Sequence, residues 1–352
     1  MGKYLDHYNT LARDMLRFLA HEQEGKNVVC SPASFVSMML VALLSTRGKS
    51  HEEIKRFLCG DLYEGMLRRW FLDTMQDPDQ ALHSADAVVI KETLKDAIVP
   101  GYTDTLRMMY GAELFATPNI VADVNAWVNK QTKGMIDKLL NEKDNLDFGL
   151  MNALAFDAPW EKPYEDDQIE SEEFHNADGT KVEVTMLGSE ESDYIETKEF
   201  TGVVKPYKGR RYAFMALLPK DEKGSLVPDS LDFSELYKNR IEDWKVIADI
   251  PEFKADFTQE LKDFCQDFGI QEIFKKNSDF SPMLNVPVEI TSVRHKAVID
   301  VSRQGTKAAA VSIMAGMVMG MPRFVTLDRP FVYAIMDTKH KLPVFVGVQR
   351  QF

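Results

Sequence analysis

The sequence predicts an α+β protein in which helices and large β-sheets pack within one domain. Apolar residues recur with helical spacing through most of the first half of the chain, and β-branched apolar runs long enough for strands dominate the second half. The 352 residues contain no internal repeat and no low-complexity linker. We therefore expect a single domain over residues 1–352.

The opening segment predicts a helix whose apolar face is formed by Tyr4, Tyr8, Leu11, Met15 and Phe18. This segment is charged and amphipathic, and it lacks the continuous apolar core of a signal peptide. Two interpretations remain open: the protein is cytoplasmic, or a signal peptide has been removed from it. No apolar run reaches the roughly 18 residues that a membrane-spanning helix needs, so we expect no membrane partner.

The next predicted helix covers residues 31–45, SPASFVSMMLVALLS. Ser31 is a suitable N-cap, and Pro32 occupies the first helical position. The segment is apolar nearly all round, which indicates a buried helix.

Two more helices are predicted before the main strands. Ser50 and Glu53, in SHEEIKRFL, have the spacing of a capping box. Residues 121–140, VADVNAWVNKQTKGMIDKLL, form an amphipathic pattern that Gly134 weakens.

Four segments have the composition of strands. Residues 210–221, RRYAFMALLPKD, are apolar on both faces up to Pro219, as in the centre of a sheet. Residues 330–352 are typical of a hairpin that turns near residues 337–341. The other two candidates are residues 86–91 and residues 288–302.

The composition argues against a polyanionic partner. A net charge of −13 disfavours nucleic acid and anionic membrane surfaces, and basic pairs such as Lys55/Arg56 lie near acids. The three cysteines, Cys30, Cys59 and Cys265, have neither metal-binding nor redox spacing. We expect no disulfide and no metal site.

No motif gives a positive reason to predict an enzyme. The stretch RGKS lacks the glycine five residues before Gly48 that a phosphate-binding loop requires. The two DFG triplets lack the other kinase motifs, and the chain contains neither HExxH nor GxSxG. We therefore predict no catalytic residue and no cofactor.

The segment GTKAAAVSIMAGMVMGMPRF, residues 305–324, has no charge between Lys307 and Arg323 and contains four methionines. A buried helix is one interpretation, because Ala and Met favour helices. Val311, Ile313 and two internal glycines weaken that interpretation. The alternative is a loop that is exposed at first and buried later.

Seven stretches together resemble the serpin family of serine protease inhibitors. They follow one another in the family's order from about Asn27 to the C-terminus, and the region between Gly60 and Ser84 is shorter than usual, so heparin-type activation is not expected. The stretches are NVVCSPASFVSMMLVALLSTRGKSHEEI, VNAWVNKQTKGMIDKLL, LMNALAFDAPWEKPY, FHNADGTKVEVTML, VVKPYKG, VRHKAVIDV and LDRPFVYAIMDTKHKLPVFVG.

The resemblance implies a fold of three β-sheets and about nine helices with an exposed reactive-centre loop at about residues 303–323. A target serine protease attacks this loop and forms a covalent acyl-enzyme. The loop then inserts into the main sheet as a new strand and traps the protease. A monomer that can form loop–sheet polymers, and an extracellular location, are also implied.

Two alternative functions stay open. One is inhibition of a cysteine protease on the same fold. The other is a non-inhibitory member of the family that acts as a binding protein.

Family spacing locates the reactive bond from both ends of the loop. The residue before the bond lies fourteen positions after Gly305 and eleven positions before Pro330. Both counts indicate Met319–Gly320. A medium, unbranched apolar residue suits the pocket of an elastase-like or chymotrypsin-like protease.

The start of the loop is the expected hinge. If Thr306 points inward on insertion, alternation along a strand turns Ala308, Ala310 and Ser312 inward as well. These residues are small and uncharged, so they would add little volume to a packed interior. The hinge comprises Gly305, Thr306, Lys307, Ala308, Ala309, Ala310, Val311 and Ser312.

The resemblance also implies a shutter in the middle of the main sheet. Ser31, Ser34, Asn152 and His295 match its positions. Their hydrogen bonds would break and reform as the sheet opens. A satisfied core histidine is the alternative interpretation of His295.

The resemblance further implies a breach, the end of the main sheet where insertion begins. Trp160 matches its tryptophan, with core filling as the alternative. Family members usually carry a Glu at the position of Arg303 and pair it with a Lys at the position of Glu252. We hypothesise a charge-swapped Glu252–Arg303 pair; two unrelated surface charges are the alternative.

Overall fold

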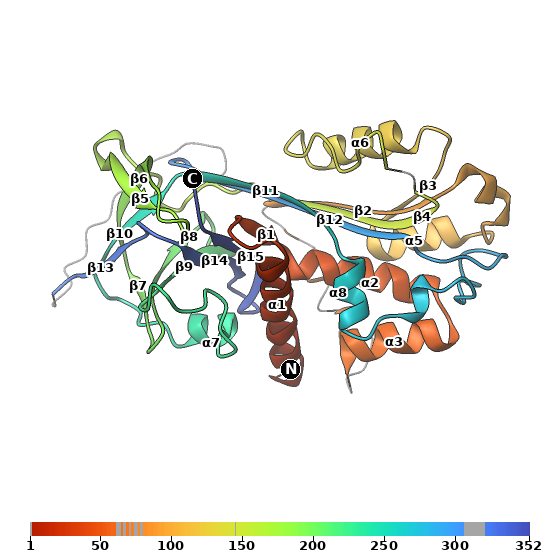
Figure 1. Cartoon of the computed structure of the whole chain (residues 1–352), viewed down its shortest axis with the longest axis horizontal. Coiled ribbons are helices and arrows are strands. Elements are labelled where there is room, and N and C mark those ends of the chain that lie inside the picture. The colour runs from red at the N-terminus through yellow and green to blue at the C-terminus, as the bar shows by residue number, and fades with distance from the viewer. Residues whose placement is uncertain are drawn as a thin grey trace.

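The computed structural model describes residues 2–60, 65, 68, 69, 72, 73, 77, 80–144, 146–305 and 321–352. Strands in these residues form sheets of five, six and four strands, with helices packed around them (Figure 1). The predicted α+β fold with three β-sheets is thereby confirmed. The five-stranded sheet extends along the molecule, and the other two sheets lie together at one end of it.

The five-stranded sheet has two parallel strands at its centre. Its order is β11 (Phe253–Glu260), β12 (Ser292–Val301), β4 (Phe148–Phe156), β2 (Leu82–Ile90) and β3 (Glu113–Ala116). The ladder between β12 and β4 is parallel and extends from Ser292 opposite Gly149 to Val298 opposite Ala155.

Helices cover both faces of this sheet. α6 (Ile120–Gln131) lies on one face, whereas α2 (Pro32–Ser45) and α5 (Tyr102–Tyr110) lie on the other (Figure 1). Because of this double cover, every residue of β4 is buried.

The six-stranded sheet contains the C-terminal hairpin that the sequence predicts. β14 and β15 pair antiparallel and turn between Asp337 and Leu342. β9, from the predicted segment 210–221, is buried throughout. The strand order is β1 (Val28–Cys30), β15 (Leu342–Gln349), β14 (Phe331–Asp337), β9 (Tyr212–Pro219), β8 (Phe200–Pro206) and β7 (Asp193–Glu196).

The four-stranded sheet holds the far end of the uncharged segment. Its order is β13 (Arg323–Thr326), β10 (Val246–Pro251), β6 (Lys181–Glu191) and β5 (Ile169–His175). β13 is an edge strand and pairs with β10 in parallel.

α2 begins as predicted. The Ser31 hydroxyl accepts the N–H of Ser34, Pro32 stands in the first turn, and almost the whole helix is buried. Further helices and 3-10 turns are α1 (Gly2–Glu22), α3 (Gly48–Cys59), α7 (Phe233–Lys238), α8 (Lys262–Asp267), η1 (Glu92–Ala97), η2 (Asp166–Gln168) and η3 (Glu272–Phe274).

The capping box predicted for Ser50 and Glu53 is wrong. α3 begins at Gly48, so Ser50 lies inside its first turn. The Glu53 carboxylate instead accepts the backbone N–H groups of Gln271 and Glu272 at 2.9 and 2.6 Å. The Glu53 side chain therefore binds a segment distant in the sequence instead of capping its own helix.

Two predicted elements are shorter in the structure. α6 ends at Gln131, because Gly134 adopts a φ of 79° and the Asn125 side chain accepts the N–H groups of Leu139 and Leu140. The strand predicted from residue 288 begins at Ser292, since the residues before it bond to other segments of the chain.

Within the described residues, no helix is both long and apolar enough to cross a membrane. Cys30 and Cys265 are free and buried, and burial raises the pKa of both thiols.

A glycine in β15 gives a test of the packing. A Cβ at Gly347 would overlap the ring of Tyr333, which lies opposite it on β14. We expect Gly347→Ala to lower the free energy of unfolding by about 1–3 kcal/mol, measured from the midpoint of urea unfolding. Gly188→Ala in β6 is the matched control, because its Cβ would meet neighbours only at 3.4 and 3.5 Å. Equal effects of the two substitutions would contradict this packing.

Candidate functional site

A row of polar side chains crosses the centre of the five-stranded sheet. His295 on β12 lies opposite Asn152 on β4, and Asn152 lies opposite Asp86 on β2. Ser31 and Ser34, at the start of α2, contact this row. The four residues predicted for the shutter are thus brought together, and Asp86 joins them.

The hydrogen bonds of the row determine which of its groups donate, which accept and which ring nitrogen of His295 carries the proton. The Ser31 backbone N–H donates to Nε2 of His295 at 3.1 Å, so Nδ1 carries the ring proton and donates to Oδ1 of Asn152 at 3.0 Å. The Asn152 amide donates in turn to Oδ1 of Asp86 at 2.8 Å. The Ser34 hydroxyl also donates to Asn152, and the Ser31 hydroxyl donates to the carbonyl of Val344.

Burial sets the charge of the row. His295 is fully buried, and desolvation lowers its pKa to about 3, so the ring is neutral. Burial raises the pKa of Asp86, while hydrogen bonds from Asn152 and Ser84 oppose that rise. Asp86 was not predicted as a site residue. The predicted strand begins at this residue, whereas β2 begins at Leu82, so the acid lies in mid-strand.

The predicted breach residues meet at the C-terminal end of β12, called its upper end below. The Trp160 indole N–H donates to the carbonyl of Ser302 at 2.8 Å, and its ring stacks on Tyr207 with centroids 4.2 Å apart. Two backbone contacts extend the junction: Trp160 N–H donates to the carbonyl of Gln304, and Tyr164 N–H donates to that of Arg303. These contacts hold the chain immediately before Gly305.

The hypothesised pair between Glu252 and Arg303 is present. Nε of Arg303 lies 3.4 Å from Oε1 of Glu252, and the backbone N–H of Arg303 donates to the same oxygen at 2.8 Å. The Arg303 side chain is 45% exposed, so solvent weakens the ion pair.

Gly305 is the last described residue before the loop. Its φ is 91°, and a Cβ on it would overlap the backbone of Ala158 to Trp160. Glycine is therefore required here by both conformation and space. The other residues predicted for the hinge, Thr306 to Ser312, and the predicted bond Met319–Gly320 lie outside the described residues.

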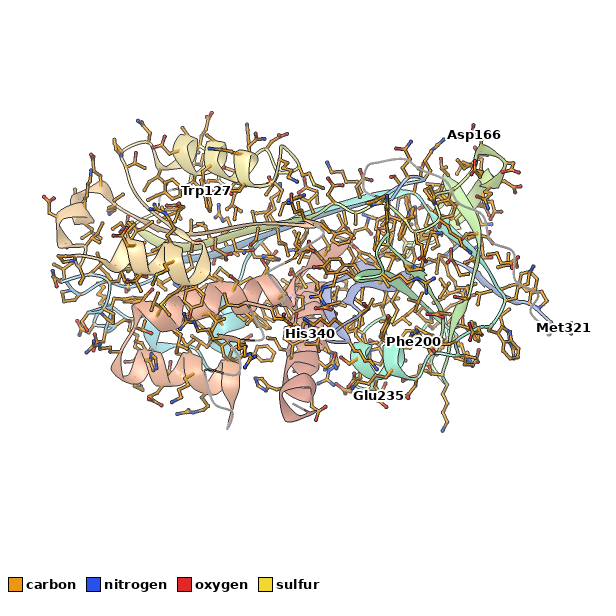
Figure 2. All side chains as sticks on the ribbon, turned by 180° about the vertical axis from the view of Figure 1, so that it is seen from behind. Trp127, Asp166, Phe200, Glu235, Met321 and His340 are labelled. Atoms are coloured by element: carbon orange, nitrogen blue, oxygen red, sulfur yellow. The ribbon has the colours of Figure 1, made fainter. Side chains whose placement is uncertain are left out.

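The far end of the loop is anchored in the four-stranded sheet. Met321 is 87% exposed and lies at the extreme end of the molecule (Figure 2). Two residues later, the Arg323 guanidinium lies 5.8 Å from the ring centroid of Tyr194 and 5.7 Å from that of Trp244. The two ends of the loop are thus held on different sheets.

Within the part of the chain that the structure describes, no group of three or more His, Cys, Asp or Glu side chains is arranged to hold a metal ion. The polar row and the breach contain hydrogen bonds and one ion pair, without an activated nucleophile.

A family model described as "Serpin (serine protease inhibitor)" matches residues 6–351. The chain therefore belongs to the serpin family, whose members are mostly protease inhibitors.

Relatives and solved structures agree with this family. Iripin-2 of Ixodes ricinus is 30% identical over 96% of this chain and 91% of the relative, and an alpha-1-antitrypsin-like protein (GS55-MS) of Ictidomys tridecemlineatus is 28% identical over 96% and 86%. The thermophilic serpin tengpin in its native state is 30% identical, with a TM-score of 0.86 over 98% of this chain and 94% of tengpin. Thyroxine-binding globulin, at 22% identity and a TM-score of 0.87, covering 99% of each chain, shares the fold.

The charge on His295 predicts a pH dependence. Its pKa is 6.5 in an unfolded chain and about 3 when buried, so the unfolded state binds more protons between these values. This contribution to stability is complete above pH 6.5 and is lost as pH falls, by up to about 1.4 kcal/mol per pH unit. Urea unfolding midpoints should fall less steeply with acid in His295→Gln than in the parent; identical slopes would contradict a buried neutral ring.

The Glu252–Arg303 pair predicts a partial rescue. Glu252→Arg and Arg303→Glu each lose an ion pair worth about 0.2–1 kcal/mol, and the first also loses the acceptor of the Arg303 backbone N–H. The double reversal should recover the ion pair but not that backbone bond. A double variant no more stable than either single one, in a thermal unfolding cycle, would show that the pair contributes nothing.

Proposed function

We propose that this chain is a suicide-substrate inhibitor that traps an elastase-like or chymotrypsin-like serine protease after attack at Met319–Gly320. The observation that carries the proposal is the parallel ladder between β12 and β4. This ladder lies at the centre of the five-stranded sheet, which is the main sheet of the proposal. It stops at Val298 and Ala155, whereas β12 continues to Val301.

The strand directions favour insertion at this ladder. A chain that leaves the upper end of β12 and turns back would run antiparallel to β12, and therefore also to β4. One parallel ladder would become two antiparallel ladders, which are slightly more stable per residue and satisfy further backbone groups. The loop begins at Gly305, beside the upper ends of both strands.

The loop sequence supports the same mechanism. The residues expected to face inward near the hinge, Thr306, Ala308, Ala310 and Ser312, are uncharged and small. An inhibitor differs from a substrate in the rate of insertion, because the loop must insert before the acyl bond is hydrolysed. Small side chains reduce the steric barrier to burial.

The surroundings of Arg323 support the proposed protease class. A trypsin-like enzyme would require an accessible cation at the bond. Arg323 is exposed, but it lies three residues beyond Gly320 and is the first residue of β13, where it is paired with Val246 of β10 and its guanidinium lies over two aromatic rings. Met319 then remains the suitable residue for an apolar pocket.

The partner in this proposal is the target protease, held in a covalent complex, and the inhibitor acts as a monomer. We propose an extracellular location, supported by a 27% identical relative named as a hibernation-specific plasma protein of Tamias sibiricus.

The direct test is to mix the protein with neutrophil or pancreatic elastase and with chymotrypsin. We expect a complex that survives a denaturing gel, with a released peptide that begins at Gly320 by mass spectrometry. Cleavage without a complex by every serine protease tried would contradict the proposal. A complex with cysteine proteases alone would indicate the cross-class inhibitor, and cleavage without thermal stabilisation would indicate a non-inhibitory binding protein.

A matched pair of variants sharpens this experiment. Ala310→Arg introduces a long cation at a position expected to face inward, and Ala309→Arg does so at the neighbouring outward position. The first should convert the inhibitor into a substrate, because burial of an unpaired charge opposes insertion. The second should keep the complex. Equal behaviour would contradict the proposed insertion register.

A further inference from the structure

A buried ion pair lies behind the breach, between the two anchored ends of the loop. Nζ of Lys205 on β8 is 2.6 Å from Oε1 of Glu191, at the end of β6. Their side chains are only 2% and 6% exposed. The pair links the six-stranded sheet to the four-stranded sheet.

The lysine side of the pair contacts the aromatic wall of the breach. Its ammonium lies 4.3 Å from the ring centroid of Tyr164 and 5.4 Å from that of Trp160. A cation over an aromatic ring is attracted strongly when water is excluded. Burial raises the pKa of Tyr164, and the negative charge of the nearby Glu191 carboxylate raises it further.

This aromatic wall holds the first end of the loop. Trp160 donates from its indole to the carbonyl of Ser302 and from its backbone to that of Gln304. Tyr164 donates from its backbone to the carbonyl of Arg303. A strand can enter between β12 and β4 only if these contacts separate, because they join the segments that follow the two strands.

The glutamate side of the pair is in register with the second end of the loop. Glu191 lies opposite Val246 on β10, and Val246 lies opposite Arg323 on β13. The Glu191 carboxylate therefore holds the end of β6, which lies next to β10, and β10 in turn pairs with β13 at Arg323. The Lys205–Glu191 pair is thus connected to both ends of the loop. Trp160 and Tyr164 lie between Lys205 and the first end, and Val246 lies between Glu191 and the second.

We propose that Lys205 and Glu191 are positioning residues that keep the breach closed until the loop is cleaved. The inference rests on the proposed insertion of the loop into the main sheet. Breaking the pair leaves a buried charge uncompensated and releases the rings of Tyr164 and Trp160. The intact loop then inserts spontaneously, and the protein becomes inactive without meeting a protease.

The test measures spontaneous conversion of the uncleaved protein, with no protease present. Lys205→Met removes the cation and retains an unbranched side chain. At a temperature at which the parent converts measurably, we expect this variant to convert about tenfold faster to a form that resists urea on a transverse gradient gel. A parent-like rate in the variant would overturn the inference, whereas conversion of the variant under conditions in which the parent does not convert would support it.

The control variant removes the same chemistry elsewhere. Arg240 pairs with Asp193 at 2.8 Å and lies 4.3 Å from the ring centroid of Tyr237, the same distance as Lys205 from Tyr164. Its ring partner belongs to α7 rather than to the breach. Arg240→Met should therefore lower thermal stability without accelerating conversion. Equal acceleration would show that general destabilisation, not the position of the pair, sets the rate.

A double variant keeps the inference testable if Lys205→Met fails to fold. Lys205→Met with Glu191→Gln leaves no unpaired charge, so it should fold, because removal of both members of a buried pair is tolerated. It still lacks the cation over the rings and should convert faster than the parent. A parent-like rate in this variant would overturn the inference.

Failure of the inference and failure of the proposed function give different results. If the parent forms the covalent complex but the Lys205 variants convert at its rate, only the inference fails. If no protease is trapped while the Lys205 variants convert faster, the inhibitory function fails and the positioning role stands.

Discussion

The parallel ladder between β12 and β4 is the constraint on which the rest of this structure depends. It lies at the centre of the main sheet with helices on both faces, so its strands cannot separate without disturbing packed layers. A parallel pair is slightly weaker per residue than an antiparallel one. The ladder also ends below the upper end of β12, where Trp160 and the chain before Gly305 close the junction. The arrangement is closed, yet the ladder at its centre is of the weaker, parallel kind.

Polar groups in the seam make its opening a discrete event. His295, Asn152 and Asp86 lie in an otherwise apolar layer, and their hydrogen bonds cross three strands. Separating β12 from β4 breaks the bond between His295 and Asn152 in a place that water does not reach. A buried polar atom without a partner is expensive, so a slightly opened sheet is less stable than either a closed one or one filled by a new strand.

The sequence predicted the features that depend on local rules. The Ser31 cap, the buried α2 and the C-terminal hairpin follow from spacing and residue type within a few positions. The resemblance to the serpin family predicted the shutter and breach residues. Asp86 and Lys205 were not predicted, because a charged residue in a strand is ordinarily expected at the surface. The pairing of Asp86 with Asn152 depends on the register of β2 and β4, and that of Lys205 with Glu191 depends on the packing of two sheets against each other. The end of α6 depended likewise on a side chain that bonds beyond the helix.

The position of the C-terminal hairpin determines what a cut in the loop leaves behind. β14 and β15 occupy the interior of the six-stranded sheet, between β1 and β9, and β13 continues from the loop into a second sheet. A molecule cut before Gly320 is two chains, but the shorter one carries strands that complete two cores. The fragments then form an obligate heterodimer held by backbone ladders and apolar side chains. Such a nicked protein migrates as one particle in native solution, and its second chain separates only when the fold is lost.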